Sequence, residues 1–270
     1  MTHRREWIYA WLLLSPALVL LFAFTHIPAI STIWDSFFST PRGIRPSKFV
    51  GLGNYEKLLM DETFWQVLSN SIWYAVVTIP VSVALALLMA IWVDGKLSGR
   101  SFVFYTPGFG LIDQISGALG YPSVNWLGNP ELALGSIMVV SIWKEAGFFM
   151  IFYLAALQSI PPVLREAAAI EGASRWTFFR RVTFPLLMPT TLFVSVNAVI
   201  NSFRMVDHVF VMTEGGPNNA SSLLLFYIYE TAFKFWDTAY ASTLTVVLLV
   251  LLSVIALGQF LLLDKRVHYR

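Results

Sequence analysis

The sequence predicts an all-α integral membrane protein, a polytopic bundle of helices, on two observations. Hydrophobic residues make up 57% of the 270 residues and charged residues only 13%, too little charge to cover the surface of a soluble domain of this size. The apolar residues also fall into blocks of about 20, the length that crosses a bilayer as a helix. The net charge of +2 does not favour nucleic acid as a partner, and the absence of cysteine excludes disulfides and thiolate metal sites.

Five segments are long enough to be membrane spans. The first follows a basic flank and has no small-residue cleavage site, so we expect a retained span and not a signal peptide. The fourth is long enough but carries several polar residues. We expect a single transmembrane domain over residues 1–270. The five segments are Trp7–Ile30, Phe64–Val93, Leu132–Leu157, Leu186–Met212 and Tyr240–Leu263.

Lysine and arginine are concentrated in the cytoplasmic loops of membrane proteins, so their positions predict the orientation of the chain. Basic clusters place both termini and the loop 158–185 in the cytoplasm. The segment 31–63 is then external, although it carries four basic residues, because long loops follow the rule weakly. The cytoplasmic clusters are His3, Arg4 and Arg5; Arg165, Arg175, Arg180 and Arg181; and Lys265, Arg266 and Arg270; the external basic residues are Arg42, Arg45, Lys48 and Lys57.

This orientation leaves one membrane crossing without a span. The second span ends inside, before Arg100, and the span that begins at Leu132 must start outside, so the chain has to cross once between them. The stretch Ser101–Ala118 is interrupted by proline and glycine, and its longest apolar run is about half a span. We favour a sixth span lost near Phe102–Val103, by deletion or because residues there are not represented in the sequence; a re-entrant segment is the alternative.

The loop 158–185 has the composition of a pair of short helices. Pro161 and Pro162 end the preceding span and can begin a new helix, and residues 166–170 are strong helix formers. Gly172 allows the backbone to turn. A basic and aromatic stretch from Arg175 is suited to lie along a membrane surface. The sequence therefore predicts a structured loop through which the membrane part is driven by something outside the membrane.

At this loop the sequence resembles a known family. Glu166-Ala167-Ala168, Gly172 and Val182-Thr183-Phe184-Pro185 stand at the spacing of the EAA loop of binding-protein-dependent ABC importer permeases, although Val182 and Phe184 depart conservatively from the usual Ile-x-Leu-Pro ending. Other stretches look like the carbohydrate-uptake branch, the maltose and glycerol-phosphate type. The family has six spans in this core, which also implies that one is missing here. The other stretches are Ala156–Pro161, Gly53-Asn54-Tyr55 with Phe64-Trp65, Asn125–Gly128 and Thr213–Pro217.

The resemblance implies partners and a role for the loop. The EAA helix of such permeases docks on a cytoplasmic ATPase subunit, so Glu166, Ala167, Ala168 and Gly172 are the expected coupling residues; an ordinary surface connector is the alternative. A dimer of ATPase subunits would hold ATP and Mg²⁺, a second homologous permease would complete the path, and an external solute-binding protein would deliver the solute. The chain has no Gly-x-x-x-x-Gly-Lys-Ser/Thr phosphate loop, so we expect it to be no enzyme and to hold no cofactor or metal.

Polar residues of the fourth predicted span are the best candidates for the substrate path. Asn197, Asn201, Arg204 and His208 are spaced by four, three and four residues, so one continuous helix would place them on a single stripe. Asp207 stands beside the stripe and could pair with Arg204 or His208. Polar groups in a span usually face a cavity or a partner. Hydrogen bonding to a partner subunit, or snorkelling at the outer interface, is the alternative.

Two further pairs complete the predicted path. Lys144 and Glu145 lie in the third span, on or beside a face shared with Ser141 and Phe148, and we favour a structural pair or a gate slightly over substrate contact. Asn70 and Tyr74 of the second span, with Trp73, could line the outer mouth, where aromatic rings stack on sugars. An interfacial aromatic belt explains them equally well.

These features predict the permease subunit of an ATP-driven importer for a sugar or sugar-like solute, placed in the inner membrane of a bacterial-type cell. Arg204 and Lys144 would suit an anionic solute, such as a sulfosugar or a glycerol phosphate, and this is the first alternative. An ion-coupled secondary transporter is the second, with Glu145 and Asp207 as its buried carboxylates. A membrane scaffold without transport is the third.

Overall fold

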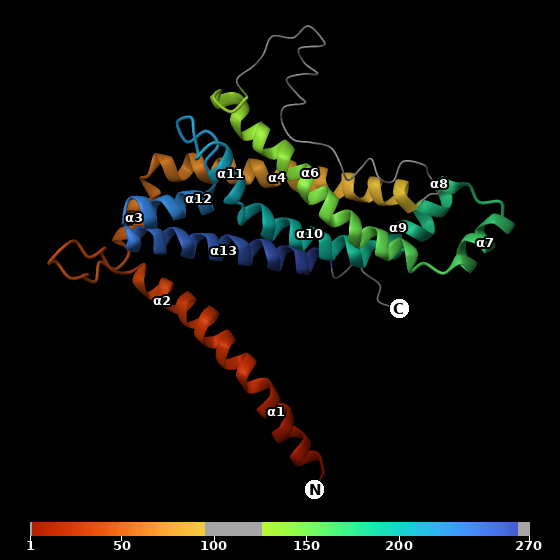
Figure 1. The fold of residues 1–270 in the computed structure, drawn as a ribbon, viewed down its shortest axis with the longest axis horizontal. Helices are drawn as coiled ribbons and strands as arrows, with labels where there is room; N and C mark the ends of the chain where they lie inside the picture. Colours follow the sequence, from red (N-terminus) through yellow and green to blue (C-terminus); the bar gives the residue numbers. More distant parts are fainter. Residues whose placement is uncertain (1, 95–125, 264–270) are drawn as a thin grey trace. The chain divides into compact units, whose positions relative to one another are not determined.

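The computed structural model describes residues 2–94 and 126–263 of the chain. These residues are mainly helical, and within them β-structure is limited to two isolated bridges, which confirms the all-α prediction (Figure 1). The elements are α1 (Thr2–Leu21), η1 (Phe22–His26), α2 (Ile27–Asp35), α3 (Gly53–Leu59), α4 (Glu62–Asp94), α6 (Pro130–Gln158), α7 (Pro162–Ile170), α8 (Arg175–Phe178), η3 (Phe179–Thr183), α9 (Phe184–Leu186), α10 (Met188–Phe203), α11 (Asp207–Met212), α12 (Leu224–Tyr229), η4 (Glu230–Lys234) and α13 (Thr238–Leu263).

Four helices of the described residues are long and apolar enough to cross a membrane, and they coincide with four of the predicted spans. A further candidate is the pair Arg175–Leu186 and Met188–Phe203, whose two parts are bent by 62°. The predicted sixth crossing near Phe102–Val103 lies outside the described residues, as does the basic cluster after residue 263. The four helices are Tyr9–Asp35, Glu62–Val93, Pro130–Gln158 and Thr238–Gln259.

The chain forms two compact units. One comprises Met1–Phe64 and Tyr227–Leu251, and the other Trp65–Phe226 and Leu252–Arg270. The second unit contains most of α4 together with α6 to α11, and with them every residue of the predicted coupling loop and substrate path. The first contains the N-terminal helix and the segment 31–63.

Long helices of the second unit pack through small side chains. Ala86 and Ala90 of α4 and Ala198 of α10 are buried in one cluster with Phe149 and Tyr153 of α6. Lipid is as apolar as these side chains, so helices in a bilayer associate by close van der Waals contact, which small residues allow. This cluster fixes α10 against α6 and α4, and thereby positions the polar residues farther along these helices.

The predicted fourth span, Leu186–Met212, is not one helix, and this prediction is wrong. α10 ends at Phe203, residues 204–206 leave helical geometry, and α11 begins at Asp207. No glycine or proline marks the break. The break is caused by tertiary contacts. Met205 is buried in the core. Asp207 starts a new helix, a position that favours an acidic residue, and it bonds to Lys144 of α6.

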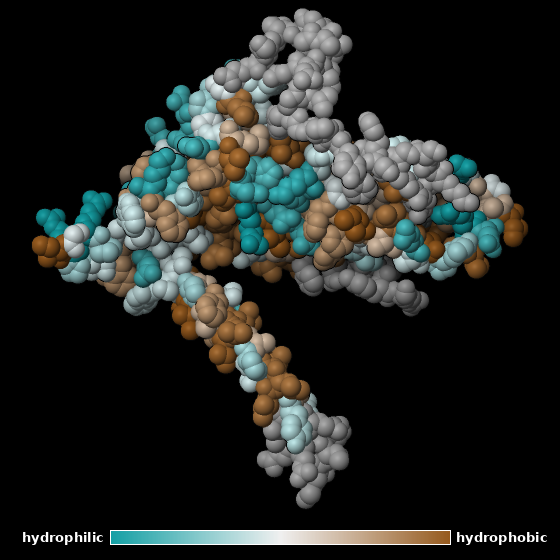
Figure 2. Space-filling view, in the orientation of Figure 1, coloured by the Kyte–Doolittle hydropathy of each residue, from teal (hydrophilic) through white to brown (hydrophobic). Residues whose placement is uncertain are grey.

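Apolar side chains of the N-terminal helix are exposed along most of its length. No residue of its most apolar stretch is buried against the rest of the chain, and Leu13 and Phe24 are 82% and 78% exposed. Figure 2 shows this helix, α1 to α2, as largely hydrophobic on the side in view. An apolar surface of this extent is stable only when lipid or another subunit covers it.

Two carboxylates organise the first unit. Asp61 accepts hydrogen bonds from Tyr240 Oη at 2.6 Å and Tyr227 Oη at 2.7 Å. Asp237 accepts one from Lys57 Nζ at 2.9 Å and another from Thr40. Burial acts to raise the pKa of each carboxyl group, but the hydrogen bonds outweigh it, so both pKa values lie below the ordinary 3.8. These bonds tie α3 and the segment 31–63 to the start of α13.

We expect this unit to keep its local stability from pH 7 to 5 and to lose it below about pH 4. A carboxyl group whose pKa is lowered by folding stabilises the folded state above its unfolded pKa, and this contribution disappears as the pH falls through the folded pKa. Hydrogen–deuterium exchange of peptides covering residues 36–64 and 237–243, corrected for intrinsic rates, measures the effect. Loss of protection already at pH 6 would contradict this assignment to Asp61 and Asp237.

Candidate functional site

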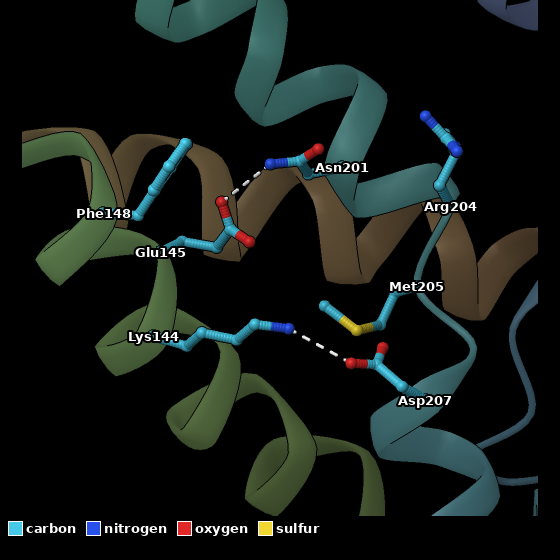
Figure 3. Close-up of a pocket in the computed structure, with 7 residues that line it drawn as sticks. All are labelled: Lys144, Glu145, Phe148, Asn201, Arg204, Met205 and Asp207. Carbon is cyan, nitrogen blue, oxygen red and sulfur yellow. Dashed lines mark hydrogen bonds and ion pairs between the residues drawn. The ribbon is translucent and has the colours of Figure 1, made fainter. Parts of the chain in front are cut away.

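A half-open cavity of about 520 Å³ lies between α6 and the break that separates α10 from α11. It collects half of the residues predicted for the substrate path, together with Asp207 (Figure 3). On the surface, a hydrophilic patch stands among apolar side chains on the face where α6, α10 and α11 lie (Figure 2). The lining residues are Lys144, Glu145, Phe148, Asn201, Arg204, Met205 and Asp207.

Glu145 and Asn201 join the two walls of the cavity. The Asn201 amide donates a hydrogen bond to Glu145 Oε2 at 3.0 Å, from α10 to α6. Both side chains are half-buried, and α10 is held there by the small-residue packing one turn earlier, at Ala198. A carboxylate that accepts a bond from an uncharged amide keeps its full negative charge and its remaining acceptor positions. Glu145 is therefore available to a hydroxyl-bearing ligand.

Lys144 pairs across the cavity with Asp207. Lys144 Nζ lies 3.1 Å from Asp207 Oδ2, and both side chains are more than half exposed. An exposed ion pair of this kind is worth at most about 1 kcal/mol, so it can open and close at little cost. The expected partnership between Lys144 and Glu145 is not observed, since Lys144 bonds to α11 and Glu145 to α10.

The predicted stripe is divided by the break. Asn201 and Arg204 line the cavity, whereas His208 lies on α11, with Nδ1 3.2 Å from Asp207 Oδ1. Asn197 donates to the Phe193 carbonyl oxygen of its own helix at 2.8 Å and is absent from the lining. Asp207 pairs with Lys144 and stands near His208, not Arg204. The prediction that the four residues form one stripe is therefore wrong, although two of them, Asn201 and Arg204, line the cavity.

Asn70 and Tyr74 of α4 lie elsewhere. The Asn70 amide donates to the carbonyl oxygens of Asn219 and Ser222, at 2.9 and 3.1 Å, and so holds the loop 213–222. Tyr74 is buried, and with Glu145 and Asn201 it lines a much smaller enclosed cavity.

The loop 213–222 adopts a fixed conformation that composition alone did not indicate. Ser221 Oγ lies within hydrogen-bond distance of Thr213 Oγ1, at 2.7 Å, and of the Gly216 carbonyl oxygen, at 2.6 Å. Gly215 has a φ of +79°, and a Cβ atom there would lie 2.8 Å from the Phe226 ring, so only glycine fits. Its glycine, proline and asparagine residues are typical of a loop, but they do not indicate its attachment to α4.

The loop 158–185 contains the two short helices that its composition predicted. α7 ends in a Schellman motif: Ala173 N donates to Ala168 O at 2.9 Å, and Gly172 N to Ala169 O at 3.1 Å. Gly172 has a φ of +71°, which an L-residue adopts only with strain. The next helix, α8, is capped by Ser174, whose Oγ accepts from Thr177 N. Both helices are therefore defined by their own caps.

An apolar stripe runs along the exposed side of α7. Val163, Ala167 and Ile170 share a face by their spacing of four and three, and Val163 and Ile170 are 67% and 88% exposed. Glu166, also exposed, is a helical neighbour of Val163 and Ile170 and so borders this stripe. A short capped helix with an uncovered apolar face and a charge at its edge has the form of a helix that lies in a groove of a partner.

Comparison with known proteins gives one family and several relatives. The family described as "Binding-protein-dependent transport system inner membrane component" matches residues 57–269. The lactose transport system permease protein LacF of Rhizobium radiobacter is 32% identical over 94% of this chain and 93% of LacF. The sn-glycerol-3-phosphate transport system permease protein UgpA of Agrobacterium fabrum is 30% identical over 97% of both chains.

A solved structure has the same fold. It is a bacterial ABC transporter involved in the import of the acidic polysaccharide alginate, and one of its chains superposes with a TM-score of 0.80 over 97% of this chain and 96% of that chain. The sequence identity is 21%, so this likeness concerns the fold alone.

Proposed function

The chain belongs to the family of binding-protein-dependent transport system inner membrane components, and from this we propose that it forms half of the translocation path for a sugar or sugar-like solute. The alternative of a scaffold without transport is thereby excluded, and the resemblance stated for the EAA loop is confirmed at the level of the family. The ion-coupled alternative gains no support from this membership.

The proposal for the solute rests on the charge balance of the cavity. Its lining has two cations, Lys144 and Arg204, and two carboxylates, Glu145 and Asp207, so its formal net charge is zero. Such a site offers several donors and acceptors for hydroxyl groups without attracting either charge. Phe148, 50% exposed in the lining, provides an aromatic face for the apolar side of a sugar ring. A neutral polyhydroxylated solute fits best.

An anionic solute is the second candidate, supported by Arg204. Its side chain is exposed in the cavity, and no carboxylate of the described residues pairs with it. A guanidinium group binds phosphate or carboxylate in two parallel hydrogen bonds. LacF and UgpA carry lactose and sn-glycerol-3-phosphate in their names, so relatives at similar identity include both kinds of solute.

We propose that α7 forms the drive contact, the surface through which an ATPase subunit acts on this chain. Its exposed apolar stripe and Glu166 would dock on an ATPase subunit, with Ala167, Ala168 and Gly172 allowing close approach. With this contact, the loop 158–185 and both termini would lie in the cytoplasm and the segment 31–63 outside. ATP and Mg²⁺ would be held by the ATPase dimer, while a second homologous permease would supply the other half of the path.

A sixth span missing before Leu132 remains our inference, and the comparison supports it. The alignment with LacF extends over 280 positions but includes 94% of 270 residues, about 254, so about 26 positions of the alignment have no residue in this chain. This is the length of one span. With the orientation proposed above, the missing crossing would follow Arg100.

The proposal is tested with the complex as it exists in the cell. Affinity-tagged chain purified from its native membranes should bring an ATPase, a second permease and a solute-binding protein. In proteoliposomes that contain this complex, neutral sugars should be taken up with ATP, and sugar acids or phosphates at least tenfold more slowly. Uptake driven by an ion gradient without ATP would exclude the proposal, and a preference for phosphorylated or acidic sugars would replace the first candidate by the second.

A further inference from the structure

The segment between α2 and α3 folds into a rigid hairpin. Ser39 N donates to Lys48 O at 2.8 Å and Val50 N to Phe37 O at 2.9 Å, so its two arms are paired. The rings of Phe38 and Phe49 pack edge to face at 5.5 Å. At the tip, the backbones of Arg42 and Arg45 exchange bonds of 3.2 and 3.0 Å. We call residues 37–50 the basic hairpin; in Figure 1 it extends past the end of α2.

Its charge is one-sided. Between Phe37 and Tyr55 the chain has three cations, Arg42, Arg45 and Lys48, and no acidic residue. All three line a second cavity, of about 340 Å³, whose wall also includes Lys57 and Asp237. Asp237 is engaged with Lys57 at 2.9 Å. In the part of the chain that the structure describes, no carboxylate neutralises the three cations of the hairpin.

The backbone of the hairpin is held in place by neighbouring groups. The Asn54 amide donates to the carbonyl oxygens of Ser36 and Phe38, at 2.8 and 2.7 Å, and so fixes the base of the hairpin to α3. Lys48 N donates to Ser39 Oγ at 3.0 Å. Lys57 Nζ lies 4.0 Å from the centre of the Tyr240 ring. A hairpin whose backbone is already ordered loses little backbone entropy when a partner binds.

An apolar residue stands at the tip, between the two arginines. Ile44 is fully exposed, and Phe49, farther down the hairpin, is 69% exposed. Arginine and aromatic residues around an apolar anchor are typical of protein interfaces. Lysine and glutamate are less frequent at the centre of such interfaces. The combination suits a protein surface with acidic groups around a shallow apolar depression.

We propose that the basic hairpin docks an acidic surface of the solute-binding protein that delivers the solute. The inference rests on the proposed function, which places the segment 31–63 outside and makes a binding protein the partner. It also gives a reason for four basic residues on the side of the membrane that usually has few. Complementary charge accelerates the encounter of two proteins and fixes their orientation. A lipid headgroup is less suitable, because the hairpin tip extends away from the helix end.

A photocrosslink at the tip identifies the occupant. Ile44 is replaced by p-benzoylphenylalanine in the full complex in cells, and Lys234, a cation of the same unit outside the cavity, is replaced likewise as a control position. Irradiation should join Ile44, and not position 234, to the solute-binding protein, at a peptide rich in aspartate and glutamate. An adduct to phospholipid, to a membrane subunit or to no protein overturns the proposal.

Affinity measurements then test the charges. The complex is placed in nanodiscs of phosphatidylcholine, and binding of the crosslinked protein is measured at several salt concentrations. Arg42→Gln with Arg45→Gln should lower the association rate roughly tenfold at low salt and flatten its salt dependence, whereas Lys234→Gln should leave both unchanged. An unchanged double variant overturns the docking site. An effect that requires phosphatidylglycerol in the nanodiscs assigns the hairpin to lipid and also overturns it. If no binding protein stimulates the wild-type ATPase, the proposed function itself fails.

Discussion

Glu166→Lys is expected to stop transport while leaving the membrane fold intact. Glu166 is exposed on α7 beside the apolar stripe, so the substitution costs the isolated chain little. In the proposed complex the lysine would place a positive charge in a desolvated groove, beside a like charge or without a partner. This would weaken docking by about 2–5 kcal/mol. Uptake should fall roughly 30-fold or more, and the ATPase should no longer copurify with the tagged chain.

Glu171→Lys is the matched control. Glu171 carries the same charge on the same loop, but it caps the end of α7, where a lysine is favoured by the helix dipole. We expect near-normal uptake from this variant at equal abundance in the membrane. If Glu166→Lys behaves like Glu171→Lys, α7 is an ordinary connector and the drive contact lies elsewhere.

Asn201→Leu should be the most damaging single change in the cavity. Leucine has the same number of side-chain heavy atoms and the same branching, but it removes the donor that Glu145 uses and leaves a half-buried carboxylate without it, at a cost of about 1–3 kcal/mol or more. It also replaces a polar lining group by an apolar one. We expect uptake to fall at least tenfold, with weaker solute-stimulated ATPase activity.

Asn197→Leu provides the comparison on the same helix. Within the described residues its amide bonds to the Phe193 carbonyl oxygen alone, one turn earlier, so leucine breaks no contact between described helices. Transport should change by less than about threefold, in line with a lost neutral hydrogen bond of about 1 kcal/mol or less. Equal losses in both variants would show that the stripe acts through a partner subunit and not through this cavity.

Spans and caps were predictable because they depend on local sequence. Apolar length located four helices, and Gly172 indicated the turn because a left-handed C-cap favours glycine. The break after Phe203 was not predictable, since neither glycine nor proline marks it and the competing contacts come from α6, far earlier in the chain. The pairing of Lys144 with Asp207, 63 residues apart, depends on that break. The prediction placed Asn70 at the outer mouth of the substrate path because its actual contacts could not be foreseen. They lie on a loop about 150 residues later in the chain.

The bend at Leu187 gives the chain a lever. Leu187 is completely buried in the cluster that joins α4 and α6, so it is a natural fulcrum, with the coupling loop on one arm and α10 on the other. Asn201 lies 14 residues farther along, about 21 Å at 1.5 Å per residue. A tilt of α10 by about 10° would then move Asn201 by about 4 Å, which is more than a hydrogen bond can stretch. A small push on the loop would thus be enough to disconnect Asn201 from Glu145 and change the shape of the cavity.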